Sequence, residues 1–322
     1  MTGAAAGGTP PVSVVIATWN AAGLVPDAIE GCLAQTVRPQ VIVVDDGSTD
    51  DTVPLLRERY GQAIVLLTQP NAERGAARNT GAARADAEIL IFLDADDRLR
   101  PTHVETVLEL ARTRPDAALW ATGGVEVDRD FRPLAPIERT PPGPITLDAF
   151  LAGDHAVLLP FGVRARAVRE IGGFVEEREL MGSEDWLLTA RLLARGDGVR
   201  AAAVTVEKRT HGANTMLDAA MMERAMRGTR ARLFGRHRAE VAARVDAIER
   251  AEDRARRAML RNLAATCYGA GEMARARAIA REAAGGSLRG VLADPALRRS
   301  WLRSWLGAPL TRGLRRLRGA RG

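Results

Sequence analysis

Residues 12–17 have the sequence VSVVIA, and the polar residues Thr18, Trp19 and Asn20 follow them directly. Three further short apolar segments occur before residue 94, at Val41–Val44, Ile64–Leu67 and Ile89–Leu93. Segments of this kind are typical of strands buried on both faces of a parallel sheet. Helical spacing is found in four stretches that alternate with them: Val25–Gln35, Thr52–Tyr60, Gly75–Ala85 and Thr102–Thr113. The alternation predicts right-handed βαβ units, and therefore an α/β fold in which helices cover both faces of a mostly parallel sheet.

Acidic residues follow two of these predicted strands. Asp45 and Asp46 come after the second strand, and Asp94, Asp96 and Asp97 come after the fourth. Ligands of open parallel sheets bind at the carboxyl ends of the strands, so we expect these side chains in one crevice. Carboxylates that lie close together repel one another unless a cation joins them. The pattern therefore predicts a bound divalent ion, and hard oxygen ligands favour Mg²⁺ or Mn²⁺.

Composition and charge divide the chain into two parts. With 322 residues, it is long enough for about two domains. Residues 1–217 contain 22 basic and 30 acidic side chains, whereas residues 218–322 contain 24 and 10. We expect a disordered N-terminus at 1–11, an α/β domain at 12–217 and a basic helical region at 218–322. Within this last region, Ala, Leu and Met have helical spacing in three segments: Met221–Phe234, Ala239–Cys267 and Gly271–Ala284.

Several classes of protein are disfavoured by the sequence. Its two cysteines, Cys32 and Cys267, are too few for a disulfide framework or a four-cysteine zinc site. It contains no run of about 18 apolar residues that would span a membrane, and its start lacks the features of a secretory signal peptide. We expect no nucleic-acid partner, because only the net positive charge of the chain would favour one. These features predict a cytoplasmic protein.

The segment Leu297–Arg318 alternates Leu and Trp with Arg around a break at Pro309. Two arrangements fit this pattern. The apolar side chains lie on an anionic membrane with the arginines beside them, or they dock on the preceding helices. The first arrangement would place the protein at the inner face of the cell membrane.

Seven sequence blocks occur in one order: VSVVIATWN (12–20), VIVVDDGSTDDT (41–52), NAERGAARNTG (71–81), ILIFLDADD (89–97), EIGGF (170–174), GSEDW (182–186) and KRTHGANTM (208–216). Over Val12–Met216 this series resembles the family 2 glycosyltransferases, which have the Rossmann-like GT-A fold and include bacterial enzymes of cell-envelope glycan assembly. The chain departs from the usual opening of the family, which has Pro at Ala17 and Tyr at Trp19. The helical C-terminal extension lies outside the resemblance.

The resemblance implies that the first two blocks bind the nucleotide of a nucleotide-diphospho-sugar donor. Asp46 would accept a hydrogen bond from the base, and the ring of Trp19 would pack on that base beside Thr18 and Asn20. The same acidic segment is also a good helix-capping sequence, so the alternative role of Asp46 is to cap the helix that follows. Arg78 would lie beside the diphosphate at the start of a helix, where an anion is favoured.

The resemblance also identifies Asp94-Ala95-Asp96 as the DxD motif. It implies that Asp96 binds the metal directly, that Asp94 reaches the ribose or the metal's water ligands, and that Asp97 supports them. His211 corresponds to a third metal ligand found in some family members. A metal ion held there would neutralise the negative charge that develops on the departing diphosphate.

The resemblance assigns the remaining step to Asp185, as the base that deprotonates the acceptor hydroxyl, with Glu184 either orienting Asp185 or contacting the acceptor. The alternative role for the pair is to cap the helix that follows. Together these features predict an inverting, metal-dependent glycosyltransferase acting on a glycan, lipid or protein hydroxyl. A nucleotidyltransferase would need a Gly-rich, Lys-containing loop after the first strand. A silent sugar-nucleotide-binding module would lack the base.

Overall fold

The computed structural model describes residues 11–137, 141–155, 157, 159–210 and 218–306, which leaves the predicted disordered N-terminus almost wholly outside it. Four parallel strands form one half of the sheet, in the order β3-β2-β1-β4. This confirms the α/β prediction and the four strands that the apolar segments indicated. Their bounds are β1 Val12–Thr18, β2 Gln40–Asp45, β3 Val65–Thr68 and β4 Ile89–Asp94.

The other half of the sheet is mixed. The order continues β9-β6-β10-β5, with β9 antiparallel to β4 and β6, and with β6 and β10 parallel to each other. Two short strands pair at its margin, β7 with β6 and β8 with β10. The bounds are β5 Arg98–Leu99, β6 Trp120–Val127, β7 Pro133–Pro136, β8 Gly143–Ile145, β9 Gly162–Arg164 and β10 Gly198–Arg209.

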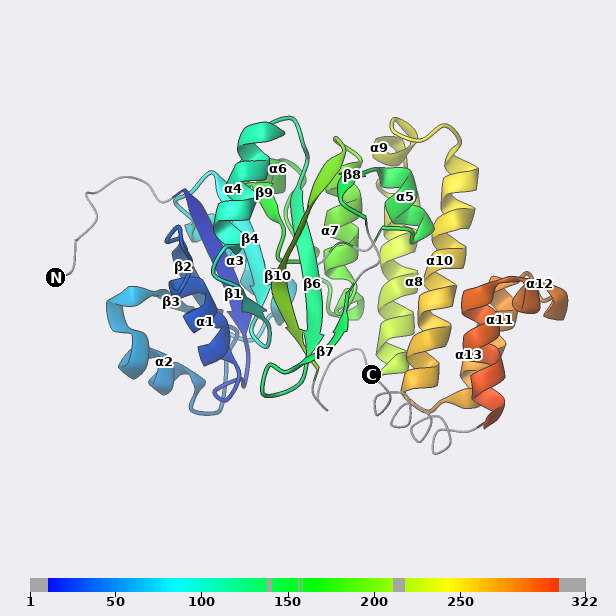
Figure 1. The fold of residues 1–322 in the computed structure, drawn as a ribbon, viewed down its shortest axis with the longest axis horizontal. Coiled ribbons are helices and arrows are strands. Elements are labelled where there is room, and N and C mark those ends of the chain that lie inside the picture. The colour runs from blue at the N-terminus through cyan, green and yellow to red at the C-terminus, as the bar shows by residue number, and fades with distance from the viewer. Residues whose placement is uncertain (1–10, 138–140, 156, 158, 211–217, 307–322) are drawn as a thin grey trace.

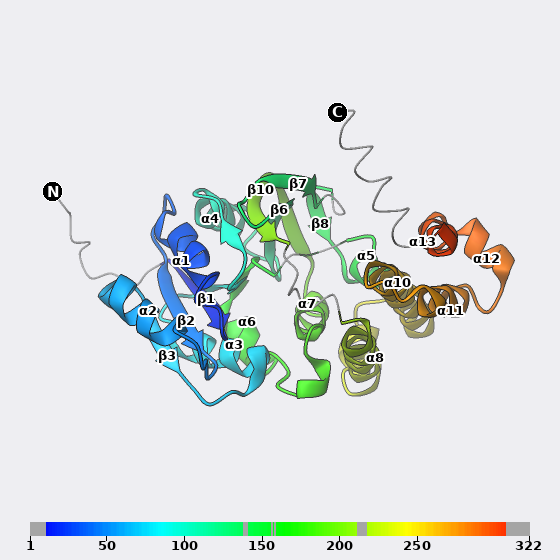
Figure 2. The same ribbon diagram turned by 90° about the horizontal axis from the view of Figure 1, so that it is seen from below.

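Successive residues of the central strands point to opposite faces, and each face has its own core. Val15 faces a core that includes α3, α5, α6 and α7, whereas Val14 and Ile16 face α1, α2 and α4. Figure 2 shows α1 and α4 on one side of the sheet and α3 and α6 on the other. The helices are α1 Val25–Leu33, α2 Thr52–Tyr60, α3 Glu73–Arg84, α4 His103–Thr113, α5 Leu147–Ala152, α6 Ala165–Glu170 and α7 Glu184–Leu193.

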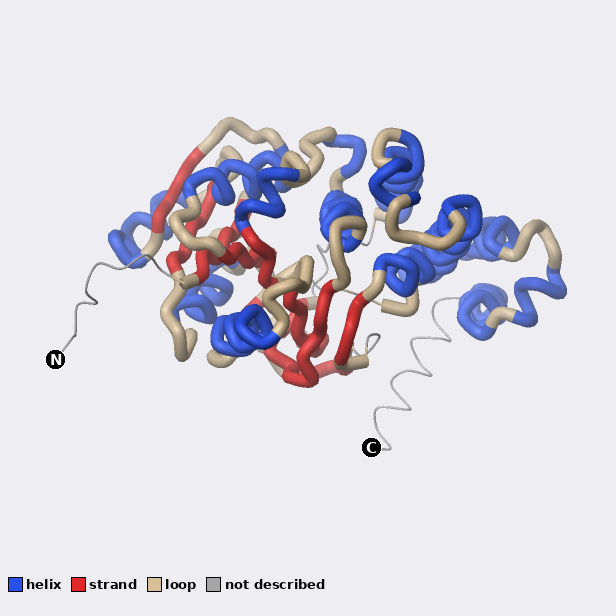
Figure 3. Tube along the Cα trace, turned by 90° about the horizontal axis from the view of Figure 1, so that it is seen from above, coloured by secondary structure: helices blue, strands red, loops and turns tan. Residues whose placement is uncertain are grey.

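The C-terminal region is helical as predicted, and it lies at the end of the molecule beyond the mixed half of the sheet (Figures 1 and 3). One expected helix is wrong, because residues 243–247 interrupt the segment Ala239–Cys267. The chain turns there so that Val241 and Ala251 both reach the core beside the sheet. The helices are α8 Ala219–Gly235, α9 Arg238–Ala242, α10 Ile248–Gly269, α11 Met273–Ala283, α12 Leu288–Ala293 and α13 Pro295–Leu306.

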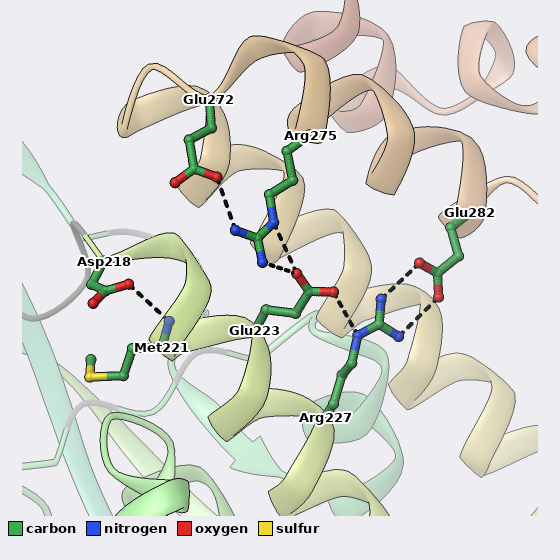
Figure 4. A network of polar contacts seen from close by, with 7 residues as sticks. All are labelled: Asp218, Met221, Glu223, Arg227, Glu272, Arg275 and Glu282. Atoms are coloured by element: carbon green, nitrogen blue, oxygen red, sulfur yellow. Dashed lines mark hydrogen bonds and ion pairs between the residues drawn. The ribbon is translucent and has the colours of Figure 1, made fainter.

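Two different cores hold these helices. Leu233 and Phe234 at the end of α8 belong to the core of α3 and α7, whereas Met222 near its start packs with α10, α11 and α13. Figure 4 shows how polar contacts add to this second packing. Glu223 of α8 accepts from Arg275 of α11 at 2.5 Å. The change at residue 217 is therefore one of composition and secondary structure, because apolar packing continues across it.

The described part of the C-terminal segment is α13. Leu297 is buried against the second helical core, and Trp301 packs partly against the same core. Residues 307–318 lie outside the described residues, so membrane contact by Leu297–Arg318 stays a prediction. Within the described ranges, no helix combines the length and the apolar character needed to cross a bilayer.

Candidate active site

Three neighbouring strand ends form the centre of the site. The register of the sheet puts Thr18 at the end of β1 beside Asp45 of β2, and Ala17 beside Asp94 of β4. The loops that carry the predicted site residues therefore leave adjacent strands at the same edge. This convergence follows from parallel pairing, as the sequence pattern indicated.

The loops after β1 and β2 are tied together by Asn20. Its backbone is in the left-handed region, with φ of 47°, and its Oδ1 accepts from Thr49 N at 2.7 Å while its own N–H donates to Ser48 Oγ at 2.8 Å. Asparagine tolerates this conformation better than most residues. Trp19 beside it is 56% exposed. The loop thus presents an indole to solvent at the strand edge.

Asp46 is buried and binds the loop between β3 and α3. Its Oδ1 accepts from Gln69 Nε2 at 2.7 Å and from Ala72 N at 3.0 Å, just before α3 begins. The start of α2 is organised instead by Asp50, which accepts from Thr52 N at 3.0 Å. Asp46 is therefore not part of the helix cap that its sequence context also allowed.

Asp94, Asp96 and Asp97 offer one carboxylate oxygen each within 4.8 Å of one another. This donor set of hard oxygens fits Mg²⁺ or Mn²⁺. Both oxygens of the buried Asp97 are already engaged, Oδ1 by Arg209 N at 3.0 Å and Oδ2 by Lys208 Nζ at 3.2 Å. Asp97 is therefore held by the end of β10 through both of its oxygens.

The pKa values of Asp94 and Asp97 are shifted in opposite directions. Burial raises the pKa of Asp97 to about 7, aided by the two neighbouring carboxylates, although the Lys208 ammonium acts in the opposite direction. Burial also acts on Asp94, but Arg78, Lys208 and Arg74 outweigh it and lower its pKa to about 2. Asp94 thus remains a carboxylate at neutral pH.

Arg78 links the β4 loop to α7. It lies in the second turn of α3 and is 3% exposed, and its guanidinium donates to Asp94 Oδ1 at 2.6 Å and to Glu184 Oε1 at 2.7 Å. Burial works against its charge, but Asp94, Glu184 and Asp185 together raise the pKa of Arg78. The sequence predicted Arg78 at a helix start beside the diphosphate. The structure shows it in the second turn of α3, bound to two carboxylates, and its place beside the diphosphate stays a prediction.

Glu184 and Asp185 form the first turn of α7, where negative charge is favoured by the helix dipole. Glu184 is buried, and its second oxygen accepts from Gly182 N at 2.6 Å. Asp185 is partly exposed, with Oδ1 accepting from Trp186 N at 2.7 Å. Burial and the adjacent charge of Glu184 raise the pKa of Asp185 to about 6, against the opposing effect of Arg78. Such a value suits a group that accepts a proton near neutral pH.

The turn before α7 is supported by α8, far along the chain. Ser183 and Thr229 of α8 share a hydrogen bond of 3.1 Å between their buried hydroxyls. A Cβ on Gly228 would collide with Leu180, so the glycine allows α8 to approach this turn closely. The C-terminal helical region therefore contributes directly to the position of the α7 acids.

The EIGGF block (residues 170–174) contacts α3 behind the same site. Asn79 of α3 accepts from Phe174 N and donates to its carbonyl, both at 2.9 Å. The Arg78 guanidinium lies over the Phe174 ring, 5.0 Å from its centroid. Gly75 lets α3 pack against the Val175 carbonyl, because a Cβ at this position would collide with that oxygen.

Sequence reasoning missed two residues of the site and located one outside the described ranges. Lys208 could have been noticed as the only lysine of the chain, but nothing in the sequence linked it to Asp97. Thr229 carried no signal, because it looks like any polar residue of a helix. His211 lies outside the described residues, so its predicted role as a metal ligand stays a prediction.

Comparison with known proteins shows a similarity to one family of glycosyltransferases. Residues 13–166 match the family model described as glycosyl transferase family 2. An uncharacterized glycosyltransferase of Nostoc sp. is 38% identical over 106 residues, which are 32% of this chain and 33% of that protein. The O-antigen chain rhamnosyltransferase RfbN of Salmonella typhimurium is 28% identical over 212 residues, 62% of this chain and 66% of that protein. The matched part thus spans a third of the first relative and just under two thirds of the second.

The fold has a solved counterpart. The crystal structure of S. aureus TarS 1–349 in complex with UDP-GlcNAc has a TM-score of 0.61 at 16% identity, covering 91% of this chain and 89% of that one. At this identity the likeness shows the fold alone, and its coverage extends into the C-terminal helices. Residues 13–166, which contain the acidic strand ends, are thus similar to glycosyl transferase family 2, and the fold agrees with a GT-A architecture.

Proposed function

We propose that the protein is an inverting glycosyltransferase that moves a sugar from a nucleotide-diphospho-sugar to an acceptor hydroxyl. The observation that carries this proposal is the double contact of Arg78, which joins Asp94 of the donor loop to Glu184 of α7. It brings the residues proposed for donor binding and those proposed for the acceptor to opposite sides of one guanidinium. The TarS complex with UDP-GlcNAc supports a donor of this class.

The proposed donor site lies along the three strand ends. Trp19 stacks on the base, and Asp46 accepts a hydrogen bond from a base N–H through Oδ2, because its Oδ1 is held by Gln69 and Ala72. Thr18 and Asn20 shape this pocket. Arg78 acts on the diphosphate only indirectly, through Asp94, because its guanidinium is buried and bound.

In the proposed reaction, the Asp185 carboxylate takes the proton of the acceptor hydroxyl. The acceptor oxygen forms a bond to the anomeric carbon, and the bond from that carbon to the diphosphate oxygen breaks on the opposite face. The nucleoside diphosphate leaves with the electron pair, and the anomeric configuration inverts. Glu184 orients Asp185 and, through its charge, helps to raise the pKa of this base.

The residues present fit a divalent ion. Asp96 and Asp94 would hold Mn²⁺ or Mg²⁺, with His211 as a further proposed ligand and Asp97 in support. When bound, such an ion would neutralise the charge that develops on the leaving diphosphate. The acceptor class that we propose is a glycan, glycolipid or other cell-surface component, assembled from the cytoplasmic side. Contact with the inner face of the membrane through Leu297–Arg318 belongs to the same proposal.

A ligand panel tests the donor. The full chain is titrated with several nucleotide-diphospho-sugars, UDP-GlcNAc among them, with and without Mn²⁺, and its melting temperature is recorded. One donor should raise the melting temperature, more so with Mn²⁺, because a ligand that binds only the folded state stabilises it. The same mixture should release nucleoside diphosphate. Release of pyrophosphate from a nucleoside triphosphate and a sugar phosphate would instead establish a nucleotidyltransferase.

A further inference from the structure

Lys208 is the only lysine in the chain, and its ammonium group is directed at the acidic loop after β4. Its Nζ lies 3.2 Å from Asp97 Oδ2 and 3.7 Å from Asp94 Oδ2. The next residue fixes this position. The Arg209 N–H donates to Asp97 Oδ1, and its buried guanidinium binds Asp27 at 2.7 Å. Through Arg209, the end of β10 is thus tied to the loop at Asp97 and to α1 at Asp27.

This arrangement places a compact positive charge against two of the three carboxylates that a divalent ion would use. An ion bound by Asp94 and Asp96 would lie within a few ångströms of Nζ, where like charges repel. The Lys208 side chain is 36% exposed, so it has room to move toward solvent. A negatively charged diphosphate in the same crevice would offer the ammonium a second partner.

We propose that Lys208 is a built-in counter-cation of the acidic loop, which weakens divalent-ion binding while the donor is absent. The inference rests on the proposed function. It implies that the ion and the diphosphate bind cooperatively. The diphosphate draws the ammonium away from the carboxylates and leaves them to the ion. Because binding free energies are reciprocal, the ion strengthens diphosphate binding by the same factor.

Calorimetric titration of the full chain with Mn²⁺, without nucleotide, tests this proposal. Lys208→Met keeps the length of the side chain and removes its charge, and it should bind Mn²⁺ about tenfold more tightly or better, given the energy of like charges about 4 Å apart. With UDP present this gain should shrink. Lys208→Arg keeps the charge, so its Mn²⁺ affinity should stay as low as that of the wild type. Arg98→Met serves as the matched control, because Arg98 pairs with Glu207 rather than with the acidic loop, and it should leave Mn²⁺ affinity unchanged.

The outcomes separate this inference from the proposed function. Equal Mn²⁺ affinity of the wild type and Lys208→Met would overturn the inference while leaving a metal site in place. Absence of Mn²⁺ binding by both proteins, with and without UDP, would overturn the inference and the metal dependence of the proposed function together. Paramagnetic resonance of Mn²⁺ gives a second measure of bound ion if the variant is less stable.

Discussion

The loop after β4 and the first turn of α7 both present carboxylates to one site, but their surroundings are opposite. Asp94 lies against Arg78 and Lys208, and its pKa is lowered to about 2. Asp185 lies beside the charge of the buried Glu184, and partial burial together with that charge raises its pKa to about 6. Asp94 therefore keeps its charge across the physiological range, whereas Asp185 can take up and lose a proton.

This difference separates binding from chemistry. Groups whose pKa values are driven apart by their environment commonly serve different steps of one reaction. The permanent charge of Asp94 suits the binding of a cation or a ribose, and the adjustable charge of Asp185 suits a base. Arg78 connects the two regions, because it binds Asp94 and Glu184 at once.

Removing the shared arginine should have the largest effect on stability. Arg78→Met leaves Asp94 and Glu184 without their buried partner, and breaking a buried ion pair in this way costs about 3–5 kcal/mol of the free energy of unfolding. Urea unfolding measures the loss. Arg59→Met is the control, since Arg59 pairs with Glu30 on the surface and should cost about 0–1 kcal/mol. Similar small losses in both variants would mean that Arg78 does not couple the two regions.

Changing the β4 loop alone should affect binding of the ion. Asp96→Ala should weaken Mn²⁺ binding by at least about 10–100-fold, the range seen even for groups that only support metal ligands. Without ligand, the variant should melt slightly higher, because repulsion within the loop falls. Calorimetry and a thermal scan measure the two effects. Asp130→Ala, at an exposed turn, should change neither. Unchanged Mn²⁺ affinity in Asp96→Ala would rule out Asp96 as the ligand.

The smallest effect is expected from the α8 contact with the turn before α7. Thr229→Val removes the hydrogen bond to Ser183 and should lower the free energy of unfolding by about 1 kcal/mol. It should also reduce kcat severalfold with donor affinity unchanged, because the α7 turn loses a support. Thr106→Val is matched to it, since both hydroxyls also donate to the carbonyl of the residue four positions earlier. Equal kcat in both variants would limit α8 to a role in stability.

The parallel half of the fold could be predicted because its signals are local. Each strand is one short apolar segment, and the polar residues that follow it share an edge once the strands are parallel. Asp46, Asp94 and Asp96 were found in this way. The alternation of Val14 and Val15 between two cores also follows from the strand period alone.

The rest of the site depends on contacts between distant residues. Arg78 and Glu184 are 106 residues apart, and Lys208 and Asp97 are 111 apart. These pairs form only because the mixed half of the sheet brings β10 beside β5 and sets α7 near α3. Pairing of this kind leaves no periodic pattern in either segment. The resemblance to a family supplied Asp185, but neither it nor the residues indicated that Arg78 is buried or that Lys208 partners Asp97.

The central claim is that Asp185 accepts the proton of the acceptor while the donor binds elsewhere. The most direct test measures transfer and donor affinity against pH for the wild type and for Asp185→Asn. In the wild type, transfer should fall about tenfold for each pH unit below about 6, because Asp185 then carries a proton already. The variant should transfer about 10²–10⁴-fold more slowly, without this dependence and with unchanged donor affinity. Near wild-type turnover in Asp185→Asn, or the same fall below pH 6, would contradict the account.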